Sequence, residues 1–172
     1  LDRNCRLTGG GHRLRRRSCC TGPCTCRTDE PGSPAGAAGE TSRQPVDGRY
    51  AARCADLREI FSEQGLIRAR VRVEIAWLKA LAGERRITEL HGITPTDLVA
   101  AQQIADGFCL ADAATVKAFE RETNHDVKAV EYLIKQKLGV HPAWQSRLEF
   151  VHFACTSADI NNLSYALMCQ EA

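Results

Sequence analysis

Apolar residues return at helical spacing through most of the chain after its first third. Leu57, Ile60 and Phe61 form one short apolar face. A longer apolar face follows and comprises Leu66, Ile67, Val71, Ile75, Leu78, Leu81 and Ala82. Residues three, four or seven positions apart lie on the same side of an α-helix. The pattern therefore predicts a short helix and then a long one, which Ser62 caps at its start and Gly83 ends.

Capping residues predict two more helices in the middle of the chain. Thr94 and Asp97 have the spacing of a capping box, and a proline between them suits the first helical position. This helix should run to about Phe108. Asp112 suits the N-cap of the next helix, which should end near Thr123.

Three further helices are expected in the last part of the chain. An apolar stripe predicts a helix that has Asn124 near its N-cap and that ends at Gly139. A second helix, from about residue 143 to 154, should return the chain, and Thr156 with Asp159 has capping-box spacing for a last one. Since no segment reads convincingly as a strand, the fold class predicted is all-α.

Two polar segments stand at the expected starts of these helices: Asn124-His125-Asp126 and Thr156-Ser157. At about 1.5 Å per residue, the outgoing helix would carry the chain about 20 Å and the returning helix about 18 Å back. Both segments should therefore lie at one end of a helical hairpin. Helix N-termini favour anions, and these side chains add directional donors, so the pair could hold a carboxylate or phosphate. The alternative is capping for stability alone, worth about 1 kcal/mol per cap.

Two histidines compete for a functional role. His125 is harder to explain as a cap, and histidine can act as donor, acceptor or cation near neutral pH. His152 lies among apolar residues in the segment 150–153, so we expect a core histidine with a satisfied side chain. The predicted helices carry no glycine-rich phosphate loop and no serine in a nucleophile-elbow setting, which disfavours nucleoside triphosphatases and hydrolases.

The first 45 residues differ from the rest in composition and charge. They carry eight arginines and four acidic residues, whereas the remainder carries fifteen basic and seventeen acidic residues. Without helical or strand periodicity, residues 1–44 are predicted to be a disordered leader. Nucleic-acid binding by the basic run 13–17 and zinc binding by a cysteine cluster are weak alternatives, because the cysteines lack paired ligand spacing. The clustered cysteines are Cys5, Cys19, Cys20, Cys24 and Cys26.

The remaining cysteines and the lack of a long apolar run bound the cellular setting. Cys54, Cys109, Cys155 and Cys169 are expected to be small free thiols packed in a reduced core. No stretch approaches about 18 uninterrupted apolar residues, so no membrane span and a cytoplasmic location are expected. The only methionine is Met168, which suggests a partial or processed product.

Four segments together carry a family resemblance. They are Pro45 to Tyr50, Ile60 to Leu66, Thr123 to Tyr132 and Phe150 to Ser164. In this order and spacing they closely resemble the N-terminal part of the bacterial-type adenylosuccinate lyases, a family of the fumarase/aspartase superfamily. The resemblance covers about residues 45–168 and is expected to fade over residues 169–172.

The resemblance implies a fold, an assembly and a reaction. It implies an N-terminal helical substrate-binding domain over residues 45–157 and the start of a central helical bundle over residues 158–172, within a homotetramer. The reaction implied is elimination of fumarate from adenylosuccinate, giving AMP, and from the succinylcarboxamide intermediate of purine synthesis. No metal or organic cofactor is implied.

The resemblance also assigns residues. Arg49 and Tyr50 match substrate-binding positions, as do the segments Asn124-His125-Asp126 and Thr156-Ser157, the latter near the succinyl carboxylates. The catalytic acid and base of the family match nothing within this chain, so we expect the chain alone not to catalyse elimination. Another lyase of the superfamily, and a non-catalytic substrate-binding or assembly module, remain open.

Overall fold

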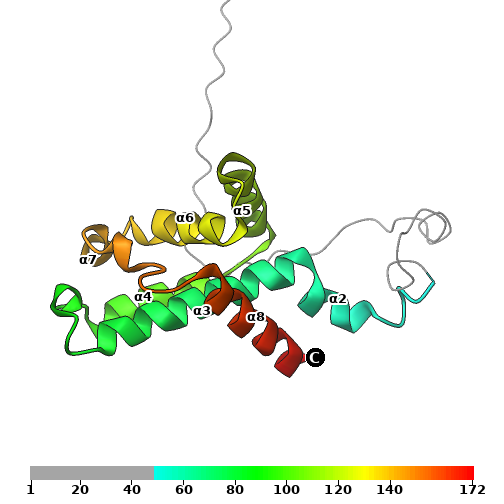
Figure 1. Cartoon of the computed structure of the whole chain (residues 1–172), viewed down its shortest axis with the longest axis horizontal. Coiled ribbons are helices and arrows are strands. Elements are labelled where there is room, and N and C mark those ends of the chain that lie inside the picture. The colour runs from blue at the N-terminus through cyan, green and yellow to red at the C-terminus, as the bar shows by residue number, and fades with distance from the viewer. Residues whose placement is uncertain (1–48) are drawn as a thin grey trace, which may run out of the picture.

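The structure, a computed structural model, describes residues 49–172 (Figure 1). Every regular element within that range is an α-helix or a short 3₁₀ helix, which confirms the predicted all-α class. The predicted leader of residues 1–44, with its basic run and clustered cysteines, lies outside the described residues.

A long central helix organises the fold. Helix α2 (Ala55–Phe61) leads into α3 (Glu63–Gly83), as the first apolar faces predict. The Ser62 side chain accepts a hydrogen bond from the Gly65 backbone N–H at 3.1 Å, which confirms the expected cap. A side chain at Gly65 would overlap the Ile60 carbonyl oxygen. The close junction of α2 and α3 therefore requires glycine at this position.

The other helices pack around α3. In chain order they are η1 (Thr88–Leu90), α4 (Pro95–Asp106), α5 (Leu110–Thr123), α6 (Asp126–Leu138), α7 (Pro142–Gln145), η2 (Leu148–Phe150) and α8 (Ser157–Glu171). Helices α4, α5, α6 and α8 all contact α3, and α5 also packs along α6 (Figure 1). The core between them is apolar, and its largest fully buried side chain is Trp144. This core holds the N-termini of α6 and α8 in place.

One helix start differs from its prediction, and a second agrees with it. Asp112 is not the N-cap of α5; it is the third helical residue, and its carboxylate accepts a hydrogen bond from the Cys109 N–H at 3.2 Å. Asn124 lies next to the N-cap of α6, as expected, and it also ends α5 in the left-handed conformation, with φ of 52°. An asparagine tolerates this conformation better than most residues. The cap of α6 itself is His125.

The predicted helix over residues 143–154 is wrong. The chain forms only α7 and η2 there, and successive i to i+3 hydrogen bonds such as Phe150 N–H to Arg147 C=O replace a continuous helix. Tertiary contacts explain the difference, because the Arg147 side chain donates to the backbone carbonyls of Glu89 and His91. These bonds tie the segment to the loop after α3.

The cysteine prediction is also wrong in part. Cys54, Cys109 and Cys155 are only half-buried free thiols, and Cys169 is exposed. Within residues 49–172, no helix is both long enough and apolar enough to cross a membrane.

Candidate anion site at two helix N-termini

His125 begins α6 through its own side chain. The Lys128 backbone N–H donates to His125 Nδ1 at 3.1 Å. Because a backbone N–H is always a donor, Nδ1 acts as the acceptor, and the neutral ring then carries its proton on Nε2. His125 is therefore a helix cap that presents an N–H group outward, a combination that the sequence prediction did not foresee.

Thr156 begins α8 in the same region. Its hydroxyl accepts from the Asp159 backbone N–H at 3.3 Å, and the Asp159 carboxylate accepts from the Thr156 backbone N–H at 2.8 Å. This is the predicted capping box. The next residue, Ser157, lies with its Oγ 3.4 Å from His125 Nε2. The N-termini of α6 and α8 therefore meet, with a histidine N–H and a serine hydroxyl between them.

Helix α3 joins these two N-termini through Arg70. This guanidinium is almost completely buried. Its Nη2 donates to Asp126 Oδ2 at 2.5 Å, and its Nε donates to Asn161 Oδ1 at 2.8 Å. One arginine thus connects the first turn of α6 with the first turns of α8, and its planar fork fixes their relative position.

One turn further along α3, two side chains hold the loop before α8. Glu74 Oε1 lies 2.6 Å from His152 Nδ1, and Trp77 Nε1 donates to the Phe153 carbonyl oxygen at 2.7 Å. The residues Arg70, Glu74 and Trp77 are spaced by four and then three positions, so they lie on one face of α3. That face is the platform on which the site is built.

Strained backbone conformations occur next to the N-termini of α6 and α8. The non-glycine residues with positive φ within the described range are Asn124 at 52°, His152 at 64° and Ala154 at 58°. Each costs free energy in this conformation, and such residues persist where surrounding contacts hold them. The Glu74 and Trp77 contacts supply that restraint for the loop 152–154.

The carboxylates of the site fall into two groups. Burial raises the pKa of Asp126, but the Val127 N–H and the Arg70 guanidinium outweigh it, so the net pKa lies below its usual range. Hydrogen bonds from Thr156 likewise lower the pKa of Asp159. For Glu74 burial dominates over the partly compensating His152, and the pKa is raised. Asp126 and Asp159 are thus ionised helix-start residues, whereas Glu74 is a carboxyl whose charge is disfavoured.

The structure brings together some of the predicted site residues and not others. His125, Asp126, Thr156 and Ser157 lie at the paired N-termini, with Asn124 adjoining them at the end of α5. Arg49 and Tyr50 do not join them. Their turn lies at the outer end of α2 (Figure 1). There the Arg49 guanidinium carbon stands 5.7 Å from the centre of the Tyr50 ring.

Four residues of this region were missed by sequence reasoning. Arg70, Glu74 and Trp77 interrupt an apolar helix with polar groups on one face, and that interruption was the signal available. His152 was expected to be a satisfied core histidine. It does pair with the buried Glu74, but its side chain is 20% exposed. It lies in the loop before α8 with a left-handed backbone.

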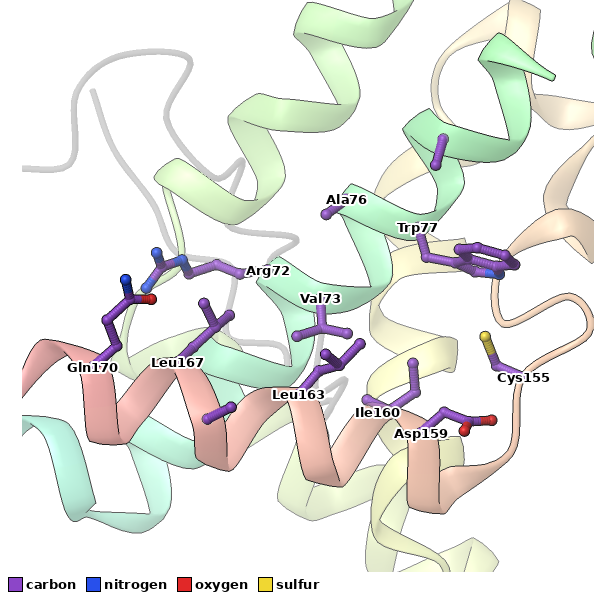
Figure 2. Close-up of a pocket in the computed structure, with 12 residues that line it drawn as sticks. Arg72, Val73, Ala76, Trp77, Cys155, Asp159, Ile160, Leu163, Leu167 and Gln170 are labelled. Atoms are coloured by element: carbon purple, nitrogen blue, oxygen red, sulfur yellow. The ribbon is translucent and has the colours of Figure 1, made fainter.

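An apolar groove of about 410 Å³ adjoins the site between α3 and α8. Figure 2 shows Val73 of α3 facing Ile160 and Leu163 of α8, with Trp77 over Cys155 and Asp159 at one end. Apolar walls of this kind suit packing against other apolar groups and do not suit a charged ligand. Within residues 49–172, no group of three His, Cys, Asp or Glu residues is arranged to hold a metal ion.

Comparison with known proteins adds to this geometry. The chain is 48% identical over 132 residues to the adenylosuccinate lyase of Escherichia coli strain K12, which covers 77% of this chain and 29% of that protein. It is 49% identical over 132 residues to the adenylosuccinate lyase of Vibrio cholerae, with the same coverage. The Legionella pneumophila (strain Corby) enzyme of the same name is 42% identical over 128 residues, which is 74% of this chain and 28% of that protein.

These matches show the family of the chain and how much of its relatives the chain covers. The chain spans less than a third of the length of these curated relatives. A family model described as lyase matches residues 48–172, so the likeness continues through residues 169–172, where it was expected to fade. From the match over most of its length, the chain belongs to the lyase family.

Proposed function

We propose that this chain forms the substrate-binding part of an adenylosuccinate lyase of purine nucleotide biosynthesis. The reaction is elimination of fumarate from adenylosuccinate, giving AMP, and from the succinylcarboxamide purine intermediate. Relatives with this name support the proposal. The observation that carries it is the 3.4 Å approach of Ser157 Oγ to His125 Nε2 at two helix N-termini, because both substrates are polyanions.

The chemistry sets what these groups must do. A proton is removed from carbon beside a carboxylate, the C–N bond breaks, and the leaving nitrogen takes up a proton. Developing negative charge is stabilised by donors fixed before the reaction begins. His125 Nε2–H, the Ser157 hydroxyl and the free N–H groups of α6 and α8 are such donors. We assign them to binding and orienting a carboxylate or phosphate of the substrate.

The proton transfers are assigned elsewhere in the complete enzyme. His125 Nδ1 is already engaged by the Lys128 N–H, so the ring serves its cap while Nε2 serves the ligand. Assembly into a homotetramer in the cytoplasm, without metal or organic cofactor, completes the proposal. Two exposed apolar side chains on α8, Leu163 and Tyr165, support packing of this helix against other helices.

A hybrid enzyme tests the function directly. Residues 48–172 of this chain replace the matching segment of the Escherichia coli relative, and fumarate release from adenylosuccinate and argininosuccinate is measured. We expect the hybrid to turn over adenylosuccinate but not argininosuccinate. His125→Ala should lower kcat/KM by about a hundredfold, since misplacing a reactant by 1 Å has that order of effect. His91→Ala, an exposed histidine outside the site, is the matched control and should change little.

The isolated chain provides the second arm of the test. It should release no fumarate at an enzymatic rate, because the proton-transfer groups are assigned to the remainder of the enzyme. Ordinary turnover by the isolated chain would contradict that division of roles. A folded hybrid without activity on adenylosuccinate would contradict the function itself.

A further inference from the structure

Glu74 is a buried carboxyl that has no part in the proposed binding of an anion. It is 0% exposed, and its Oε2 has no hydrogen-bond partner among the described residues. The neighbouring positions on α3 that face inward, Val71 and Ile75, are apolar and fully buried. A buried carboxylate with an unpaired oxygen destabilises a protein relative to an apolar side chain that fills the space. Stability alone therefore does not account for a glutamate at this position.

The single contact that Glu74 makes points to its role. Its Oε1 lies 2.6 Å from Nδ1 of His152. Above its raised pKa Glu74 is ionised and can only accept, so Nδ1 then carries the proton in this pair. The other ring nitrogen, Nε2, has no hydrogen-bond partner among residues 49–172, and it belongs to a side chain that is 20% exposed. A carboxylate behind a histidine fixes the tautomer and the direction of the ring.

His125 and His152 therefore carry their ring protons on different nitrogens. His125 accepts a backbone N–H at Nδ1 and presents Nε2–H. His152 instead donates its Nδ1–H in a hydrogen bond to the ionised Glu74 carboxylate, and in this tautomer Nε2 presents a lone pair. The two rings thus differ in what they present, His125 a donor and His152 an acceptor, and the acceptor depends on a residue of α3.

The left-handed backbone of His152 makes this dependence stronger. At φ of 64° the residue is held by its contacts and not by local preference. Those contacts come from Glu74 and, at the next residue, from the Trp77 bond to the Phe153 carbonyl. Loss of the carboxylate would therefore free both the ring and its tautomer.

We propose that Glu74 is a positioning residue that acts through His152, holding the ring in its Nδ1–H form with Nε2 directed to substrate bound at the N-termini of α6 and α8. The part of this inference that concerns substrate rests on the proposed lyase function. The coupling of Glu74 to the His152 ring is independent of that function and can be measured on the full chain alone.

Nitrogen NMR of the full chain, labelled with ¹⁵N-histidine, tests the coupling. A His152→Asn variant identifies the ring signals by their loss. The unsubstituted chain should show a protonated Nδ1 in His152, whereas Glu74→Leu and Glu74→Gln should shift the ring toward a mixture of tautomers. Glu131→Gln removes another buried carboxylate, one that pairs with Lys128 and Lys135, and should leave His152 unchanged. Unchanged His152 signals in every folded Glu74 variant would overturn the proposal.

Kinetics of the hybrid enzyme test the consequence for substrate. Glu74→Gln should lower kcat on the order of tenfold, with a smaller effect on KM, as expected for a residue that orients a reacting group. In a His152→Asn background the same substitution should have no further effect, because Glu74 acts through that ring. An equal loss in both backgrounds would overturn the proposal. If the hybrid shows no activity at all, the lyase function fails, and the tautomer measurement still decides the role of Glu74.

Discussion

Replacing Arg70 by methionine is the sharpest test of how the site is held. The substitution keeps an unbranched apolar side chain but removes both bonds of the guanidinium, to Asp126 and to Asn161. A hydrogen bond to a charged group is worth about 1.5–3 kcal/mol, and breaking a buried ion pair costs about 3–5 kcal/mol. The Asp126 side chain is 42% exposed, so water can take up part of its charge. We therefore expect a loss of about 2–3 kcal/mol in the free energy of unfolding.

Urea unfolding followed by circular dichroism measures this loss. With a slope of about 1–3 kcal/mol per molar urea, the midpoint should fall by about 0.7–3 M while the slope stays constant. Arg72→Met is the matched control, since Arg72 lies two positions further along α3 and its pair with Glu171 is solvent-exposed. That variant should lose less than about 1 kcal/mol. Equal losses in the two variants, or none for Arg70, would refute the reasoning.

Three further predictions follow from contacts of the site. His125→Ala should lower the free energy of unfolding by about 1 kcal/mol through loss of the α6 cap, and His125→Asn should restore it in thermal melts without restoring activity of the hybrid. Trp77→Phe should cost at least about 1 kcal/mol, because the bond to the Phe153 carbonyl is lost together with part of the indole packing against the core. A loss below about 0.3 kcal/mol would count against that bond. Burial raises the pKa of Glu74 above 4.5 despite His152, so the folded chain binds a proton there that the unfolded chain releases. As pH rises from about 4.5 through that raised pKa, the unsubstituted chain should therefore lose stability relative to the Glu74→Gln variant. Urea unfolding midpoints of the two proteins measure this difference. Midpoints that change in parallel over this pH range would contradict the raised pKa.

Local signals in the sequence predicted most helix boundaries. The capping boxes of α4 and α8 depend only on residues three positions apart, such as Thr94 with Asp97. Gly139 ends α6 for an equally local reason. By contrast, the segment after Pro142 lost its predicted helix to contacts from Arg147 with backbone some 56 to 58 residues away. No pattern along the chain encodes such a contact.

The site shows the same division. Proximity of His125 and Ser157 was predicted, although the continuous returning helix used to argue it does not exist. The chain still returns, because α7, η2 and the loop before α8 cover the distance. The platform of α3 was not predicted, since the partners of Arg70 and Glu74 lie 56 to 91 residues away in the chain. Spacing along one helix predicts which residues share a face, but only the tertiary fold determines which residues that face contacts.

Helix α2 has a mechanical consequence. It buries none of its seven residues, and it joins α3 through the tight turn at Ser62 and Gly65. A helix of seven residues is a rigid arm of about 10 Å, so a rotation of about 20° at its base moves its tip by about 3–4 Å. Arg49 and Tyr50 stand at that tip. Any partner that packs against α2 therefore sets how near the Arg49 guanidinium and the Tyr50 ring come to a molecule held at the N-termini of α6 and α8.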